Sequence, residues 1–383
     1  MAPRILFICL EFRNWQQARS LAYPSQLGLA DALRARGATV LTLPAVHGIA
    51  ADAPGSWLCH AQRLCAGMHF DQVWVEVVHS SLDTKTLSWL ASLAPVRVGF
   101  ILESLQYTPA IYAQAPHLQG RKEWVWDRLR FLTHAVAADE VDAAEIERSG
   151  VARGMWWPQA VPEQFLASAP APVGNQHAVF YGAMYGDRAH WFAHPQLKDL
   201  LQSPQPSLEH ATSYPRHFNE LMQAGMTNLE QGVMPSRETL NEYMDILGHV
   251  RREIFKLWLQ SLQTGCAVVN LPSFFNGYPG RVFEAMAAGR PVITPRLLDR
   301  PRTASLFTEG EEILLFDGTD PDDLAACIRQ VQAHPQRARE LAERALRKVR
   351  DRHTLERRVE EILMWTIEGA VPRYGMESSC LAA

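Results

Sequence analysis

One stretch of the sequence, residues 267–294, combines residue types and spacing that can bind a phosphate-bearing ligand. An apolar run leads into a loop that contains Gly277 and Gly280, and a helical stretch and a second apolar run follow. Glycines let a ligand approach the backbone, and the free amides at the start of a helix attract a phosphate or diphosphate. In the first turn of the predicted helix we expect Arg281 to face that anion. The carboxylate of Glu284 can accept hydrogen bonds from two neighbouring hydroxyls, as on a ribose.

Plainer roles are open to both charged residues. Glu284 can be a partner of the helix dipole alone, and Arg281 can be a solvated side chain. Other site motifs are missing: the first predicted strand has no G-x-G-x-x-G after it, and there is no P-loop, no G-x-S-x-G and no H-E-x-x-H. The run 320–323 resembles a D-x-D metal motif. Its proline and carboxylates also favour a helix start, which we expect here.

The 383-residue chain has the composition of an ordinary globular protein, with 47% hydrophobic residues, 20% charged residues and a formal net charge of −4. These values argue against disorder and against sequence-independent binding of nucleic acid, which depends on phosphate neutralisation. Apolar runs are too short for a membrane span, so we expect at most peripheral membrane contact. The six cysteines form no C-x-x-C pair, and Cys9 and Cys266 lie in apolar runs, which fits a reducing cytoplasm.

Apolar periodicity predicts alternating strands and helices in two successive halves, which is typical of parallel sheets with helices on both faces. The first half has predicted strands 5–10, 40–43, 73–78, 96–102 and 135–138 and predicted helices 25–36, 57–66, 87–93 and 124–132. The second half has predicted strands 178–181, 267–270, 292–294 and 313–316 and predicted helices 238–262, 281–288, 321–332 and 336–365.

A segment rich in proline, glycine and small residues, 167–176, separates the two halves and is predicted to be a linker. The sequence therefore predicts one doubly wound domain over 1–166, a second over 177–350, and a C-terminal helix and tail over 351–383. Ligands of open α/β sheets bind at the carboxyl ends of the strands and in clefts between domains. We expect the site in a cleft between the two domains.

The stretch 267–294 resembles the C-terminal signature of family 4 (group 1) glycosyltransferases of the GT-B fold. The matching positions are Pro272, Ser273, 284–287, Gly289 and 291–293. In the family, a first glutamate contacts the donor sugar and a second holds the ribose. The resemblance implies that Glu284 binds the ribose. Asn276 stands in the place of the first glutamate and is expected to contact the sugar as a neutral hydrogen-bonding group.

Further runs resemble the CgeB-like branch of these enzymes. The run 180–188 fits the pattern F-x-G-x-x-Y-x-x-R and contains Gly182 and Arg188. The run 231–236 resembles a loop near the nucleotide base and contains Gly232 and Val233. Weaker similarities lie at 161–165, 309–316 and 352–357. The resemblance covers about residues 178–361, and the N-terminal domain carries no diagnostic motif.

The resemblance implies an α/β protein of the GT-B fold, in which two Rossmann-like domains face a cleft. The N-terminal domain would take the acceptor, the C-terminal domain the nucleotide-sugar, and the tail would pack back on the N-terminal domain. It implies a retaining glycosyltransferase of bacterial-type glycan biosynthesis that moves a hexose-type sugar from a UDP, GDP or dTDP donor to a glycan, lipid-linked or protein acceptor. No metal or cofactor is expected. The implied donor-binding residues are Gly182, Gly232, Val233, Asn276, Gly277, Tyr278, Gly280, Arg281 and Glu284.

Four residues are candidates for catalysis. Arg188 and Arg281 are expected to stabilise the leaving phosphate. On the acceptor side, His79 and Glu103 follow predicted strands, and either could orient or deprotonate an acceptor hydroxyl or simply cap a loop or form an ion pair. Two alternatives stay open: a degenerate GT-B protein that binds nucleotide or a partner without turnover, which the substitution at Asn276 allows, and a sugar-nucleotide epimerase, for which no acid/base cluster is visible.

Overall fold

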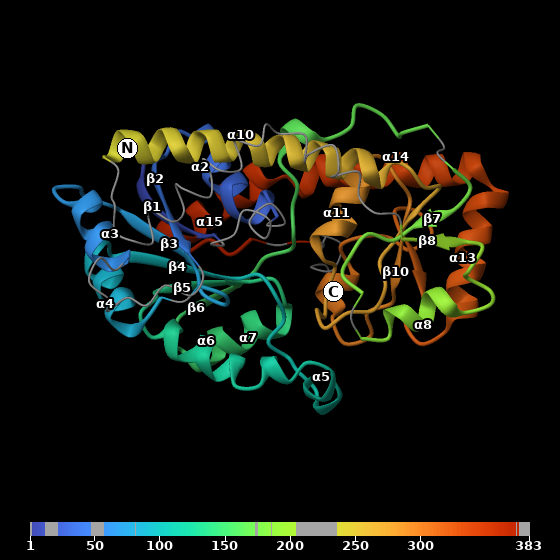
Figure 1. The fold of residues 1–383 in the computed structure, drawn as a ribbon, viewed down its shortest axis with the longest axis horizontal. Coiled ribbons are helices and arrows are strands. Elements are labelled where there is room, and N and C mark those ends of the chain that lie inside the picture. The colour runs from blue at the N-terminus through green and yellow to red at the C-terminus, as the bar shows by residue number, and fades with distance from the viewer. Residues whose placement is uncertain are drawn as a thin grey trace, which may run out of the picture. The chain divides into compact units, whose positions relative to one another are not determined.

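The computed structural model describes residues 2–11, 22–46, 57–80, 82–172, 175–184, 186–203, 236–372 and 374. Two compact units share this chain, and each is built from three separate segments (Figure 1). Unit 1 contains Met1–Leu105, His117–Trp157 and Glu209–Phe255, as far as these ranges are described. Unit 2 contains Gln106–Pro116, Pro158–Leu208 and Lys256–Ala383, again as far as they are described.

Unit 1 is built on a six-stranded parallel sheet with the strand order β2-β1-β3-β4-β5-β6. Its strands are β1 (Arg4–Glu11), β2 (Thr39–Val46), β3 (Gln72–Glu76), β4 (Val96–Ile101), β5 (His134–Ala137) and β6 (Arg153–Trp156). The five strands predicted for this half are confirmed. The sixth, β6, escaped prediction because Arg153 and Gly154 interrupt its apolar pattern.

The described helices of unit 1 alternate with its strands, and two of these helices begin at a capping carboxylate. The described helices are the π-helix η1 (Pro24–Gly28), α2 (Leu29–Ala35), α3 (Trp57–Cys65), α4 (Thr84–Leu93), α6 (Arg121–Leu129) and α7 (Glu140–Ser149). The carboxylate of Asp83 accepts a hydrogen bond from the amide of Thr86 at the start of α4. Helix α7 begins in the same way at Asp139 and ends at Gly150, whose φ of 70° a side chain would disfavour.

The longest helix, α10 (Arg237–Leu262), belongs to unit 1 up to Phe255 and to unit 2 from Lys256 onward (Figure 1). In unit 1, Arg251 Nη2 of this helix donates a hydrogen bond at 2.5 Å to Oε2 of Glu11, the last residue of β1. Both side chains are almost completely buried. Removing one partner of such a pair leaves a buried charge and costs about 3–5 kcal/mol. The pair therefore ties α10 to the first strand.

Unit 2 is built on a five-stranded parallel sheet with the strand order β11-β10-β9-β7-β8. Its strands are β7 (Ala178–Val179), β8 (Leu201–Gln202), β9 (Val268–Val269), β10 (Val292–Pro295) and β11 (Leu314–Phe316). Its helices, besides the end of α10, are α5 (Pro109–Gln114), η3 (Glu163–Phe165), α8 (Arg188–Ala193), α11 (Gly280–Ala287), α12 (Pro301–Ala304), α13 (Pro321–Ala333), α14 (Pro335–Arg352) and α15 (Leu355–Glu368). The short helix η2 (Pro116–Leu118) lies where the chain returns to unit 1.

The core of unit 2 lies between its sheet and its helices. Apolar residues of the strands pack with those of α13, among them Phe180, Val269, Ile293, Phe316 and Ile328. Helix α13 begins at Asp320, whose carboxylate accepts from the amides of Asp322 and Asp323, with Pro321 in the first turn. The helix start predicted at 320–323 is confirmed, and Asp320 caps it.

Each sheet contains one point at which the strand order reverses. In unit 1 the chain runs from β1 outward to β2 and then continues on the other side of β1 with β3. In unit 2 it runs from β7 to β8 and then continues on the other side of β7 with β9. Ligands of doubly wound sheets bind outside the carboxyl ends of the strands at such a point. The loops after β1 and β3, and after β7 and β9, are therefore the places to examine.

The helical stretch predicted over 336–365 is two helices, α14 and α15, which meet at His353 and Thr354. The predicted helical character is confirmed. The break was not predicted because the polar helical pattern continues across it, while Thr354 caps α15 by accepting from the amide of Arg357. Both helices lie in unit 2, where Thr354 pairs with Val161. The predicted boundaries at 166 and 176 and the packing of the tail on an N-terminal domain stay predictions. No helix in the described ranges is long and apolar enough to cross a membrane.

Candidate functional site

The predicted donor residues of unit 2 gather at its strand-order reversal. The loop after β7 contains Gly182 and leads to Arg188, the first residue of α8. The loop after β9 leads through Asn276 to Gly280 and Arg281 at the start of α11. Because the strands are parallel, both loops leave the sheet at the same edge. The sheet topology therefore brings two separate sequence motifs to one place.

The guanidinium group of Arg281 is held against the loop after β7. Its Nη1 donates at 3.1 Å to Oδ1 of Asn270, whose Nδ2 donates at 3.0 Å to Thr294 Oγ1. The guanidinium carbon lies 4.8 Å from the ring centre of Phe180, within cation–π range. A Cβ on Gly182 would lie 2.5 Å from Arg281 Nη2. Gly182 is therefore needed for Arg281 to keep this position.

The carboxylate of Glu284 is buried and held by an indole. Trp258 Nε1, near the end of α10, donates at 2.8 Å to Glu284 Oε2. The other oxygen, Oε1, forms no hydrogen bond with a described residue and lies 3.1 Å from where a Cβ on Gly280 would stand. Burial raises the pKa of Glu284, against the lowering effects of the Trp258 hydrogen bond and the charge of Arg281. This carboxylate oxygen next to a glycine is thus ready to accept from a ligand hydroxyl.

The predicted helix 281–288 puts Glu284 in its first turn, whereas the structure puts it in the second. Helix α11 begins at Gly280, so Glu284 is its fifth residue, and its first turn contains no acidic residue. Helical side chains lean toward the N-terminus, which brings the carboxylate back over Gly280. The residue before the helix is Pro279, and no side chain caps the first turn. The amides of this turn and the Glu284 carboxylate together offer donors for an anion and an acceptor for a hydroxyl.

Arg188 is engaged by the protein itself. Its Nε donates at 3.1 Å to the carbonyl of Pro272 and its Nη1 at 2.7 Å to the carbonyl of Ala183. The side chain is buried, and its guanidinium carbon lies 5.1 Å from the ring centre of Phe180. Arg188 therefore connects the loop after β7 with the loop after β9, and its charge lies near Arg281 on the same ring.

Three other predicted donor residues lie in the loop before α11. Asn276 is partly buried, and its Nδ2 donates at 3.4 Å to the carbonyl of Gln106. Gly277 is buried, and a Cβ there would meet the ring of Phe275 at 2.8 Å. The ring of Tyr278 packs against Phe307 at 6.0 Å, and burial raises the pKa of its hydroxyl to about 12. The side chain of Tyr278 thus belongs to the core of unit 2, and a donor contact at this residue would come from its backbone.

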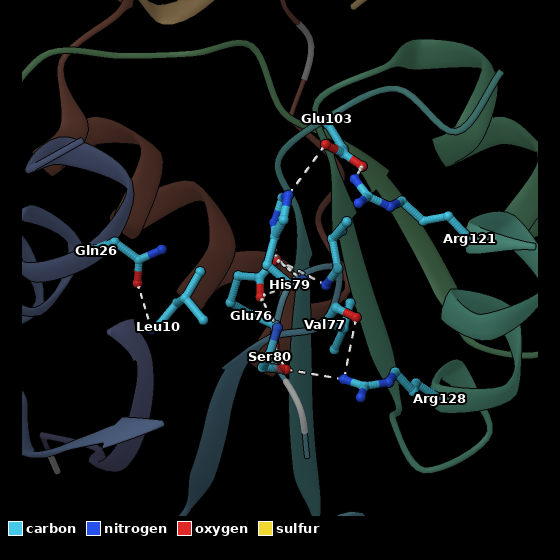
Figure 2. Close-up of polar contacts among 10 residues, drawn as sticks. Leu10, Gln26, Glu76, Val77, His79, Ser80, Glu103, Arg121 and Arg128 are labelled. Carbon is cyan, nitrogen blue, oxygen red and sulfur yellow. Dashed lines mark hydrogen bonds and ion pairs between the residues drawn. The ribbon is translucent and has the colours of Figure 1, made fainter. Parts of the chain in front are cut away.

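In unit 1, His79 and Glu103 form one polar cluster (Figure 2). His79 follows β3 and Glu103 follows β4, and the imidazole Nε2 lies 3.4 Å from Glu103 Oε2. Arg121 of α6 donates at 2.7 Å to Glu103 Oε1. On its other side the imidazole Nδ1 lies 3.2 Å from Oε1 of Glu76. The two residues that the sequence singled out are therefore direct neighbours, together with Glu76 and Arg121.

The charges in this cluster shift the pKa values of His79 and Glu103 in opposite directions. Burial would lower the pKa of His79, but hydrogen bonds to Glu103 and Glu76 and the charges of both carboxylates raise it to about 9. Burial would raise the pKa of Glu103, but hydrogen bonds and charge attraction to His79 and Arg121 lower it to about 2. At neutral pH, His79 is thus protonated and Glu103 is ionised. Both pKa values favour orienting a hydroxyl over removing its proton.

Three residues that sequence reasoning missed hold the two clusters in place, and a fourth supports a neighbouring strand. Trp258 and Asn270 bond to Glu284 and Arg281, and Glu76 bonds to His79. In the same region of unit 1, Gln26 Oε1 accepts from the amide of Leu10 at 2.9 Å and supports the end of β1 (Figure 2). Only Glu76 and Asn270 carried a sequence signal: Glu76 interrupts the apolar run 73–78, and Asn270 ends the run 267–270. Trp258 and Gln26 meet their partners through the tertiary fold.

Two predicted donor residues, Gly232 and Val233, lie outside the described residues. Within the described ranges, no group of three or more histidine, cysteine, aspartate or glutamate side chains could hold a metal ion. Metal independence stays a prediction.

The sequence and the fold were compared with those of known proteins. Residues 252–364 match the family described as glycosyl transferase-like. This range contains Trp258, Arg281 and Glu284. A sequence search of curated proteins gives no significant match.

Solved structures resemble the chain over most of its length. Sucrose-phosphate synthase from Thermosynechococcus elongatus is 13% identical with a TM-score of 0.56, and the alignment covers 96% of this chain and 98% of that one. A glycosyltransferase from Rickettsia africae is 11% identical with a TM-score of 0.54 and the same coverage. HepE from Anabaena, solved in complex with UDP-glucose, is 13% identical with a TM-score of 0.53, covering 96% and 100%. The chain thus has the two-domain α/β architecture of GT-B glycosyltransferases, as predicted.

Proposed function

We propose that this protein is a glycosyltransferase that takes a sugar from a nucleotide-sugar donor bound by unit 2. The single observation that carries the proposal is the Glu284 carboxylate, buried beside Gly280 at the start of α11 with Oε1 unbonded among the described residues. A carboxylate oxygen next to the N-terminal turn of a helix matches a ribose hydroxyl next to a diphosphate. The glycosyl transferase-like family match at 252–364 and the UDP-glucose in HepE support this assignment.

On the donor side, each residue of unit 2 has a distinct proposed role. Glu284 accepts from the ribose, and the amides of the first turn of α11 bind the diphosphate. Arg281 supplies positive charge as the bond between the anomeric carbon and the phosphate oxygen breaks, because negative charge then grows on the leaving diphosphate. Arg188 fixes the two loops and adds its charge nearby. Asn276 and Gly277 are proposed to contact the sugar, and Gly232 and Val233 the base.

The finer classification is also part of the proposal. The motif resemblance to family 4 and to its CgeB-like branch favours transfer with retention of anomeric configuration, without a metal. The donor would be a UDP, GDP or dTDP sugar of hexose type, and the acceptor a glycan, a lipid-linked glycan or a protein. A cytoplasmic location fits the buried reduced thiols of Cys9 and Cys266. His79 and Glu103 of unit 1 are proposed to orient the acceptor.

A second candidate function is binding without turnover. Asn276 favours it, because a neutral amide in the place of a carboxylate stabilises developing positive charge on the sugar less well. Turnover of a sugar nucleotide by the wild-type protein, and its loss in Asn276→Ala, would exclude this candidate.

Thermal unfolding with nucleotides tests the donor site directly. UDP, GDP, dTDP, CMP and ADP, each with matching sugar nucleotides, are added to the wild-type chain, to Glu284→Gln and to the control Glu343→Gln, an exposed glutamate of α14. A ligand at 100 times its Kd adds ~2.7 kcal/mol, or about 3 °C in Tm if a chain of this size unfolds as one cooperative unit. We expect one nucleotide series to raise Tm of the wild type and of Glu343→Gln and not of Glu284→Gln. Equal shifts in all three would refute the role of Glu284.

A further inference from the structure

The loop after β3 is wrapped around one carboxylate. Glu76, the last residue of β3, accepts hydrogen bonds from three successive backbone amides: Val78 at 2.8 Å, His79 at 2.9 Å and Ser80 at 2.9 Å. Ser80 Oγ in turn donates to the backbone carbonyl of Glu76 at 2.5 Å. The Glu76 side chain is 5% exposed. A buried carboxylate with this many donors fixes the backbone that carries His79 (Figure 2).

A second charged group fixes the same loop from the helix side. Arg128 of α6 is buried and donates to Ser80 Oγ at 3.0 Å, to the carbonyl of Leu82 at 2.7 Å and to that of Val77 at 3.4 Å. The loop is thus held between Glu76 and Arg128. His79 itself remains 39% exposed, so the loop presents its imidazole at the surface of unit 1.

The imidazole of His79 lies between two carboxylates. Its Nδ1 lies 3.2 Å from Glu76 Oε1, and its Nε2 lies 3.4 Å from Glu103 Oε2 (Figure 2). An ionised carboxylate only accepts hydrogen bonds, and a neutral imidazole has only one N–H. Both contacts can be hydrogen bonds only when both ring nitrogens carry a proton. A carboxylate beside each ring nitrogen therefore favours the imidazolium form.

We propose that Glu76 is a positioning residue that keeps His79 as a fixed imidazolium, so that unit 1 offers a hydrogen-bond-donating cation beside the Glu103 carboxylate. The charged groups around the ring support this. Glu76 of β3 and Glu103 after β4 face its two nitrogens, while the positive groups of α6 are directed elsewhere: Arg121 bonds to Glu103, and Arg128 bonds to the loop. Since hydrogen bonds to both carboxylates raise the pKa of His79 to about 9, the charge persists at neutral pH.

The role of this cation in transfer rests on the proposed function, whereas its protonation state does not. The 3.4 Å separation of His79 Nε2 and Glu103 Oε2 is longer than the 2.7–2.9 Å typical of charge-assisted hydrogen bonds. An acceptor hydroxyl can therefore accept a hydrogen bond from Nε2–H and donate a hydrogen bond to Glu103, keeping its proton. Each cation of the cluster is balanced by a carboxylate, which favours an uncharged hydroxyl-bearing group over an anionic one.

Imidazole nitrogen NMR on the full-length chain, labelled with ¹⁵N-histidine, tests the protonation state. The chain has 14 histidines, and His79→Gln identifies the signal that belongs to His79. We expect wild-type His79 to carry a proton on both nitrogens at pH 7.5 and to titrate near pH 9. Glu76→Gln should lower its titration midpoint by at least one pH unit, a tenfold change in proton affinity. The control Glu145→Gln, which removes the partner of Lys122, should leave it unchanged.

Two results would overturn the proposal: a wild-type midpoint near 6.5, or a folded Glu76→Gln variant with an unchanged midpoint. If Glu76→Gln does not fold, the wild-type titration and Glu103→Gln, which leaves the loop around Glu76 intact, decide the matter. In transfer assays the alkaline limb of kcat/KM should move to lower pH together with the His79 midpoint. A limb that stays in place would refute the role in transfer alone. Absence of any transfer would count against the proposed function and leave the NMR result standing.

Discussion

The indole N–H of Trp258 donates a hydrogen bond to the carboxylate of Glu284 at 2.8 Å, from the end of α10 to the second turn of α11. This bond occupies Oε2 and leaves Oε1 directed at the start of α11. The indole also packs edge-on against Tyr181 at 5.6 Å. Trp258 thus sets the orientation of the one acidic group that we assign to the ribose.

Trp258→Phe should therefore weaken nucleotide binding while preserving most of the packing. The phenyl ring keeps a contact with Tyr181, but a buried carboxylate loses its donor, which costs about 1–3 kcal/mol of stability. Isothermal titration calorimetry with the nucleotide identified by thermal shift measures the affinity. Trp89→Phe is a matched control, since its indole N–H bonds to no described residue, and it should bind like the wild type. Unaltered affinity in Trp258→Phe would show that the indole does not position Glu284.

Glu284→Gln should raise the thermal stability of the protein and weaken nucleotide binding. Burial raises the pKa of Glu284, so at neutral pH the folded state bears the cost of a buried charge that the unfolded state does not. The protonated side chain bears no such cost, so its contribution to stability is complete below the ordinary pKa of 4.5. This contribution is lost as the pH rises through the raised pKa. The glutamine variant should melt about 1–3 °C higher than the wild type at pH 7 without ligand, and it should lose the nucleotide-induced shift. A lower Tm without ligand would contradict the cost assigned to this charge.

Gly182→Ala should disturb the donor site through Arg281. The added methyl would lie 2.5 Å from Arg281 Nη2 and 2.9 Å from the ring of Phe180, so the guanidinium group must move away from Asn270. We expect at least a tenfold loss of nucleotide affinity. Gly248→Ala in α10 is the control: its methyl would meet only Leu27 at 3.9 Å, and alanine favours a helix by about 1 kcal/mol. If Gly182→Ala binds as tightly as Gly248→Ala, Arg281 does not contact the diphosphate.

The His79 cluster predicts a particular pH dependence of stability. The pKa of His79 rises from 6.5 to about 9 on folding, so its contribution is complete below pH 6.5 and disappears as pH rises through 9. The pKa of Glu103 falls from 4.5 to about 2, so its contribution is present above pH 4.5 and disappears as pH falls through 2. In thermal melts the Tm of the wild type should exceed that of His79→Gln at pH 6, and the two Tm values should be equal at pH 10. A difference that grows toward pH 10 would have the wrong sign.

The local pattern of the sequence predicted most of the described elements, and the donor site stays a prediction. Glycine, arginine and glutamate at 280–284 lie within one helix, so their mutual placement follows from helical geometry and needs no tertiary information. The two-domain α/β class followed in the same way from alternating periodicity. The break at Thr354 was missed because helical patterns lie on both sides of it and only the capping hydroxyl marks the boundary.

The supporting residues of the site could not be predicted in that way. Trp258 is 26 positions from Glu284, and nothing in the helical pattern of α10 distinguishes it from a core tryptophan. The sequence likewise placed Arg188 at a leaving phosphate, and only the fold shows two of its nitrogens on the carbonyls of Ala183 and Pro272. Tyr278 was expected to contact the donor because it belongs to the glycine-bearing loop, yet its side chain packs against Phe307. Such assignments depend on which way a side chain turns from a correctly placed backbone.

The ion pair of Glu11 with Arg251 can form only late in the synthesis of the chain. The two residues are 240 positions apart, and both lie in unit 1. During synthesis the first strand therefore leaves the ribosome long before the cation that neutralises its buried terminal carboxylate exists. Long-range contacts of this kind slow folding and leave partly folded chains exposed to aggregation. The nascent sheet of unit 1 is expected to reach its final stability only after Arg251 has emerged, when most of the chain is already outside.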